Sequence, residues 1–116
     1  MKIKIVGGSG YLGNRLSEFL KKRDHSVVSG SRNIEISKSN NNFTYIDFNS
    51  STNMDQFCKE ADVIIYSGGM SQHECNNISM EDLNNQINEF YNFYDTVIKN
   101  QIKKFIYIST SQEYES

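Results

Sequence analysis

Apolar residues occur along this chain in two patterns, as short unbroken runs and as longer stretches in which they recur every three or four positions. Short runs are typical of parallel strands covered on both faces, and the spaced pattern is typical of helices with one apolar face. Strands are expected at residues 3–6, 26–30, 43–46, 61–66 and 103–108. Helices are expected from the glycine-rich turn at 7–13 to about residue 23, after a cap signature at 52–55, and over 79–100. This alternation predicts an α/β fold with a doubly wound parallel sheet in the strand order 3-2-1-4-5, as one domain over residues 1–116.

One connection departs from this alternation. From Ile34 to Asn42 the chain is polar and rich in Asn and Ser, without an apolar period. Between the second and third strands we therefore expect no helix, or only a turn. With right-handed crossovers, one face of the sheet would then carry two helices and the other face only the first helix.

The turn after the first strand has the glycine pattern of a phosphate site. Gly7 allows a sharp turn, Gly10 allows a pyrophosphate to approach the backbone, and Gly13 allows the helix to pack closely on its strand. The free N–H groups at the start of the helix, where Tyr11 and Leu12 stand, would hold the phosphates together with the helix dipole. An ordinary structural glycine turn is the alternative. The strand before the turn and the apolar helix face after it favour a dinucleotide site.

The glycines are spaced as GxxGxxG rather than GxGxxG. In this spacing the chain resembles the extended short-chain dehydrogenase/reductases, the family of NAD-dependent sugar-nucleotide epimerases and dehydratases. The resemblance covers the whole chain and implies the first part of a Rossmann fold. Val6 stands where members of the family usually have Thr. The missing hydroxyl removes a loop contact but leaves the phosphate cradle.

The end of the second strand bears on the choice of cofactor. NAD-preferring relatives place an acidic side chain there, whereas this chain has Ser31, Arg32 and Asn33. A carboxylate would repel a 2′-phosphate, but a guanidinium and a hydroxyl would bind one. The resemblance is to NADP-using members, whose strand ends in a similar Arg-Asn pair. We expect NADP, with NAD as the alternative cofactor and a surface arginine without a ligand as the alternative role of Arg32.

Two further strand ends complete the cofactor site that the resemblance implies. Asp47, followed by Phe48, stands where family members place an Asp that contacts the adenine edge, and a turn or capping Asp is the alternative. Ser67, Gly68 and Gly69 follow the fourth strand, where relatives have small residues. The adenosine ribose and the diphosphate pass over this turn in the family, and a plain glycine turn is the alternative.

The segment from Ser109 to Tyr114 resembles the end of the family's catalytic strand. Thr110 is the position of the catalytic Ser or Thr, whose hydroxyl would hydrogen-bond to the substrate oxygen that gains or loses a hydride. The family's reaction also needs a Tyr with a Lys four residues later, and none of the seven tyrosines here has one. Two hypotheses follow. The chain is the cofactor-binding portion of a sugar-nucleotide epimerase, dehydratase or reductase, or it is a nucleotide-binding module without catalytic activity.

The helix at 79–100 carries more apolar surface than one sheet face requires. Its apolar residues follow at steps of four and three, with Tyr91 and Phe93 on the flanks of the stripe: Leu83, Ile87, Phe90, Tyr94, Val97 and Ile98. In the family this helix forms much of a dimer interface, so the resemblance implies a homodimer through it. A stripe that is simply core is the alternative. For the complete protein, the resemblance implies a nucleotide sugar as substrate.

Composition disfavours several other functions. The net charge of −2 gives no basic surface for nucleic acid or for an acidic membrane. No apolar run approaches the length of a membrane span, and Met1 leads directly into a strand, so we expect a cytoplasmic protein without membrane contact. Cys58 and Cys75 lack paired spacing and are expected to be reduced thiols. His73 and Cys75 alone cannot supply a metal site.

These 116 residues are predicted to bind NADP(H) without turning over a nucleotide sugar. Binding needs only the glycine turn, the strand ends and Asp47, whereas proton transfer needs a positioned acid or base. No neighbour of Thr110 accepts its proton, and Tyr114 has no lysine four residues later. A turnover assay on protein whose intact mass ends at Ser116 tests this, and a measurable cofactor-dependent rate would contradict it. A longer product of the same gene that carries Tyr-x-x-x-Lys should be active and should lose most activity on Thr110→Val.

Overall fold

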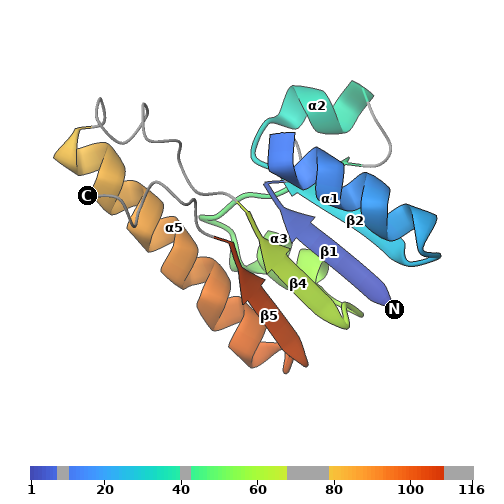
Figure 1. The fold of residues 1–116 in the computed structure, drawn as a ribbon. Coiled ribbons are helices and arrows are strands. Elements are labelled where there is room, and N and C mark those ends of the chain that lie inside the picture. Colours follow the sequence, from blue (N-terminus) through green and yellow to red (C-terminus); the bar gives the residue numbers. More distant parts are fainter. Residues whose placement is uncertain (8–10, 40–42, 68–78, 109–116) are drawn as a thin grey trace, which may run out of the picture.

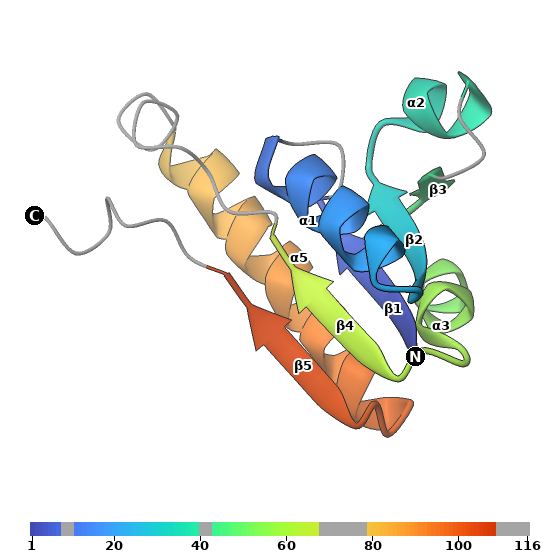
Figure 2. The ribbon, with the colours of Figure 1, turned by 45° about the vertical axis from the view of Figure 1, so that its right-hand side comes forward.

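The computed structural model describes residues 1–7, 11–39, 43–67 and 79–108. Its elements in chain order are β1 (Lys2–Val6), α1 (Tyr11–Lys22), β2 (Ser26–Ser31), α2 (Ile34–Ser39), β3 (Phe43–Tyr45), α3 (Ser51–Cys58), β4 (Val63–Tyr66), α5 (Met80–Lys99) and β5 (Lys104–Tyr107). The strands pair in parallel and form one sheet in the order β3-β2-β1-β4-β5. α3 and α5 cover one face of this sheet, and α1 covers the other (Figure 1, Figure 2). The doubly wound α/β fold and its strand order are therefore confirmed.

The central strand β1 supplies side chains to both halves of the core. Successive side chains of a strand point to opposite faces of the sheet. Ile3 and Ile5 lie in the apolar cluster against which Leu16 of α1 packs. Val6 lies in the other cluster, together with Phe93 of α5. One strand thus anchors the helices of both layers.

Lys4 is a charged residue that lies half-buried within β1. Its ammonium nitrogen lies 5.5 Å from the centre of the Phe57 ring in α3. The same nitrogen donates to the carbonyl of Lys59, the C-cap residue of α3, at 3.0 Å. Burial lowers the pKa of the Lys4 ammonium. Because a helix ends with unpaired carbonyls, Lys4 satisfies one of them and ties α3 to the sheet.

A short helix, α2, connects β2 to β3, so the expectation of no helix or only a turn is wrong. Its start is fixed by Asn33, whose Oδ1 accepts the backbone N–H of Glu35 at 2.9 Å. The Ser37 hydroxyl donates to the carbonyl of Ile34 at 2.7 Å. Polar side chains that bond to the local backbone therefore fold this segment. A helix of six residues needs no apolar period for this.

The cap of α3 also differs from the expected one. The helix is capped by Ser50, whose Oγ accepts the backbone N–H of Asn53 at 3.1 Å, and not by Thr52. Asp55 was expected to complete a cap with Thr52. Its carboxylate instead accepts a hydrogen bond from Lys99 of α5 at 3.2 Å. Asp55 therefore joins two helices instead of capping its own.

The long helix α5 begins as expected but turns a different face towards the sheet. The Oγ of Ser79 accepts the backbone N–H of Asp82 at 3.1 Å, which confirms the predicted cap. Its buried residues are Phe93, Thr96 and Val97. Four residues of the helix that were assigned to the apolar stripe or its flanks are exposed: Ile87, Tyr91, Tyr94 and Ile98. Since apolar residues occupy both faces of α5, the period alone does not decide which face is buried.

Gly30→Ala is expected to destabilise the protein by about 1–3 kcal/mol, the usual cost of overpacking a filled core. A Cβ atom at Gly30 would lie 2.8 Å from Cε1 of Phe57 and would collide with the side chain of Ile46. Both of these side chains are buried. Denaturant unfolding measures the loss, with Ser26→Ala at the exposed start of the same strand as the control. Equal unfolding free energies for the two variants would contradict this account of Gly30.

Candidate functional site

The ends of four parallel strands meet at one edge of the sheet (Figure 2). Gly7 follows β1, Arg32 follows β2, Asp47 comes two residues after β3, and Ser67 follows β4. The backbone N–H of Gly7 donates to the carbonyl of Gly30 at 3.0 Å, which holds the first two ends together. Ligands of open α/β sheets bind at this carboxyl edge. The structure therefore brings together the predicted residues that it describes at these strand ends.

Gly7 makes the sharp turn that leads from β1 towards α1. Its φ of 83° lies in the region that side chains disfavour, so Gly7 has the turn role expected of it. The first turn of α1 contains Leu12, which is exposed, and Gly13, which is buried. The start of a helix presents free N–H groups and a positive dipole end, which together can bind a phosphate. Four other predicted site residues lie outside the described part of the chain: Gly10, Gly68, Gly69 and Thr110.

Ser31 and Arg32 form the exit of β2. Ser31 is buried, and its Oγ accepts the backbone N–H of Asn33 at 3.0 Å. Arg32 is exposed, with its guanidinium carbon 5.6 Å from the centre of the Phe48 ring. Its Nη1 donates to Oε1 of Glu89 in α5 at 3.1 Å. Sequence reasoning missed Glu89, because an ion pair 57 residues apart in the chain leaves no local pattern.

Asp47 organises the turn between β3 and α3. Its Oδ1 accepts the backbone N–H of Asn49 at 2.9 Å, and its own backbone N–H donates to Oδ1 of Asn53 at 2.7 Å. The Nδ2 of Asn53 donates to the carbonyl of Tyr45 at 3.2 Å. The structure thus shows Asp47 as a turn residue, which was the alternative role, and its contact with adenine stays a prediction. Asn53 was missed, although it bridges both ends of this turn.

Phe48 and Ser67 connect the candidate site to the buried core and to β1. Phe48 is buried, and its ring meets Phe93 edge to face with 6.1 Å between the ring centres. Because the guanidinium of Arg32 lies over this ring, Phe48 contacts the cation from the core side. The hydroxyl of Ser67 donates to the carbonyl of Val6 at 3.0 Å, and its backbone N–H donates to the same carbonyl at 2.9 Å. Ser67 therefore fixes the direction in which the chain leaves β4.

Tyr66, the last residue of β4, packs into the core next to the candidate site. Its ring centre lies 5.1 Å from that of Phe90 and 5.8 Å from that of Phe93. Burial raises the pKa of the Tyr66 hydroxyl to about 12, although the positive charge of Arg32 opposes this rise. The hydroxyl is therefore protonated at neutral pH and cannot act as a base there. Burial also raises the pKa of the Cys58 thiol to about 12. Cys75, the other cysteine expected to be a reduced thiol, lies outside the described part of the chain.

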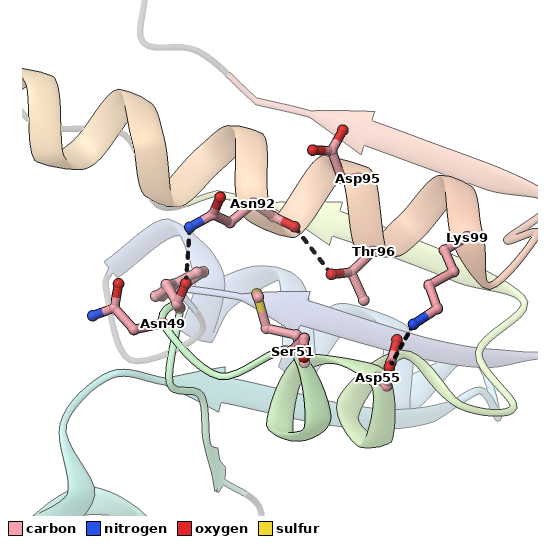
Figure 3. A pocket seen from close by; sticks show the side chains of 9 residues that line it. Asn49, Ser51, Asp55, Asn92, Asp95, Thr96 and Lys99 are labelled. Carbon is pink, nitrogen blue, oxygen red and sulfur yellow. Dashed lines mark hydrogen bonds and ion pairs between the residues drawn. The ribbon is translucent and has the colours of Figure 1, made fainter.

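A pocket of about 410 Å³ opens beside this edge, between α3 and α5 (Figure 3). The Nδ2 of Asn92 donates to the carbonyl of Phe48 at 3.2 Å, and Lys99 forms an ion pair with Asp55 at 3.2 Å. These bonds join α5 to α3 and to the turn before it, so they give the polar groups of the pocket a structural role. The remaining residues that line the pocket are Asn49, Ser51, Met54, Asp95 and Thr96.

Two other classes of site are not found in the part of the chain that the structure describes. No three side chains of His, Cys, Asp or Glu gather there in a way that could hold a metal ion. Nor does any described helix combine the length and the apolar character that crossing a membrane requires.

Three solved structures illustrate how widely this arrangement is shared. UDP-N-acetylglucosamine 4-epimerase from Bacillus cereus matches with a TM-score of 0.74 at 20% identity, over 95% of this chain and 40% of that protein. Triphenylmethane reductase from Citrobacter sp., complexed with NADP(H), matches with a TM-score of 0.73 at 16% identity, over 98% of this chain and 39% of that one. A short-chain dehydrogenase/reductase superfamily protein from Agrobacterium tumefaciens with bound NAD matches with a TM-score of 0.72 at 11% identity, over 99% of this chain and 34% of that protein. This chain shares their fold and spans two fifths of their length or less.

Sequence comparison gives the family. No curated protein sequence matches the chain. The model of the NAD dependent epimerase/dehydratase family, however, matches residues 3–116, from the first strand through the glycine-rich turn to the last residue of the sequence. The resemblance carried by the GxxGxxG spacing is thereby confirmed, and the chain belongs to the NAD-dependent epimerase/dehydratase family.

Proposed function

We propose that this chain binds a nicotinamide dinucleotide at the carboxyl edge of its sheet, as the cofactor-binding portion of a sugar-nucleotide epimerase, dehydratase or reductase. The observation that carries the proposal is the turn at Gly7, with a φ of 83°, between the central strand and α1. Membership of the family over residues 3–116 supports it. When bound, the nicotinamide ring accepts or gives a hydride.

The residues at this edge fit such a cofactor. The start of α1, with the backbone of Tyr11 and Leu12, offers N–H groups and a positive dipole end to the pyrophosphate. Ser31 and Arg32 are assigned to the adenosine ribose, and Asp47 to the adenine edge. Ser67, with Gly68 and Gly69 that follow it in the sequence, is assigned to the ribose and the diphosphate. The hydroxyl of Thr110 is assigned to the substrate oxygen that gains or loses the hydride.

Arg32 is the reason to propose NADP instead of NAD. A guanidinium can form two parallel hydrogen bonds to a phosphate, and its charge favours the doubly charged 2′-phosphate of NADP(H). The Arg32 side chain is 53% exposed, so a ligand can reach it at the end of β2.

Arg32→Asp is expected to weaken NADPH binding by about tenfold or more and to make NADH the tighter ligand, since a carboxylate repels the 2′-phosphate. Calorimetric titration of both cofactors into both proteins measures this. Arg23→Asp, with the same change of charge beyond the end of α1, is the matched control and should leave the order of affinities unchanged. Equal affinities for the two cofactors in wild type and in Arg32→Asp would show that Arg32 does not determine the choice of cofactor.

A second candidate function is a nucleotide-binding module without catalytic activity. The observation in its favour is that none of the six tyrosines before Tyr114 is followed by a lysine four residues later. The two candidates differ in whether the natural reading frame continues past Ser116 into a Tyr-x-x-x-Lys motif. For the first candidate we propose a nucleotide sugar as substrate and the cytoplasm as location.

We also propose that the chain self-associates through the outer face of α5. The exposed residues Ile87, Tyr91, Tyr94 and Ile98 follow at steps of four, three and four, so they form one stripe along the helix. In the described part of the sheet, β5 pairs with β4 alone and so forms an edge of the sheet. An exposed apolar stripe beside a strand edge favours association.

The double variant Tyr91→Glu with Ile98→Glu is therefore expected to reduce self-association, because it places two carboxylates in this stripe. Light scattering over a range of concentrations measures the mass of the particles. The control is Asn84→Glu with Asn88→Glu, which adds the same charge to exposed positions of the same helix. A stable wild-type monomer at high concentration, without binding of an apolar dye, would contradict the proposal.

A further inference from the structure

The ion pair between Arg32 and Glu89 joins the exit of β2 to the middle of α5. Nη1 and Oε1 lie 3.1 Å apart, at hydrogen-bond distance. The two side chains are unequally exposed, with 53% of the Arg32 side chain accessible and 22% of the Glu89 side chain. Glu89 is thus the more enclosed partner, and Arg32 is the partner that can swing out into solvent.

Neighbouring contacts fix the enclosed partner in place. Asn92 lies three residues after Glu89, on the same side of α5, and its Nδ2 donates to the carbonyl of Phe48 at 3.2 Å. The Phe48 ring lies under the guanidinium of Arg32, at 5.6 Å. α5 is therefore held to the turn after β3, and Glu89 is held facing the end of β2. The arginine that the proposed function assigns to the 2′-phosphate already has a carboxylate ligand.

We infer that Glu89 is a specificity-determining residue, whose carboxylate competes with a 2′-phosphate for Arg32 and so weakens NADP(H) binding relative to NAD(H). This inference rests on the proposed dinucleotide site. A 2′-phosphate can take the guanidinium only by drawing it away from Glu89 or by sharing it with a carboxylate of like charge. The first course leaves a partly enclosed carboxylate without its partner, and the second adds repulsion. The 2′-hydroxyl of NAD(H) is uncharged and meets neither obstacle.

If Glu89 has the opposite role, the change in NADPH affinity on removal of its carboxylate has the opposite sign. If the carboxylate held Arg32 ready for the phosphate, its removal would weaken NADPH binding. We consider competition the stronger effect, because the bond to Glu89 uses Nη1 and so occupies one of the paired edges through which a guanidinium can bind a phosphate.

Glu89→Gln tests the inference, since it removes the charge and keeps the shape of the side chain. NADPH should bind roughly two- to fivefold more tightly than to wild type, the scale of an exposed ion pair, while the affinity for NADH should stay the same. The gain should shrink at high salt, which screens the pair. Glu81→Gln, the same change in the first turn of α5, is the matched control and should alter neither affinity. Calorimetric titration of both cofactors into the three proteins gives all six dissociation constants without any need for turnover.

Two further variants separate the outcomes. Glu89→Asp keeps the charge but shortens the side chain, so it should give an intermediate gain, and circular dichroism shows whether each variant is folded. In an Arg32→Ala background, Glu89→Gln should lose most of its effect on NADPH, because competition acts through Arg32. Unchanged or weaker NADPH binding in Glu89→Gln would overturn the inference and leave the proposed function standing. A wild-type chain that binds neither dinucleotide would overturn both.

Discussion

Parallel pairing of β1 on both of its sides is the constraint on which the site depends. β2 and β4 flank this strand in the same direction, so the chain leaves all three strands at one edge of the sheet. Residues that are far apart in sequence, such as Gly7, Arg32 and Ser67, therefore arrive at the same place. The buried alternation of Ile3, Ile5 and Val6 stabilises this arrangement, because it gives each helical layer a share of the same strand.

α5 belongs to the core and to the site at once. Its inner face carries Phe93, which packs against Phe48, Phe57 and Tyr66, so the helix holds both the turn after β3 and the end of β4. Four residues before Phe93, Glu89 meets the cation at the end of β2. The packing of α5 that the fold already requires thus positions a charged group at the candidate site.

The sequence predicts those parts of the structure that local physics decides. Apolar runs predict the sheet and its order, and Ser79 predicts the start of α5 correctly because a cap is a contact within one turn. The start of α3 is mispredicted because Ser50, and not Thr52, accepts the capping bond, while Asp55 pairs with the distant Lys99. α2 is missed because its stabilising bonds are polar. Glu89 could not be found at all, since its role depends on where two distant elements meet.

Asn53 holds the turn after β3 with three separate hydrogen bonds. Its backbone N–H, its amide oxygen and its amide nitrogen each make a separate hydrogen bond, to Ser50, Asp47 and Tyr45. An aspartate lacks the side-chain donor, and a glutamine places both groups one methylene farther away, so neither can replace all of these bonds. Either substitution therefore leaves a backbone group at one end of the turn, the carbonyl of Tyr45 or the N–H of Asp47, without its side-chain partner.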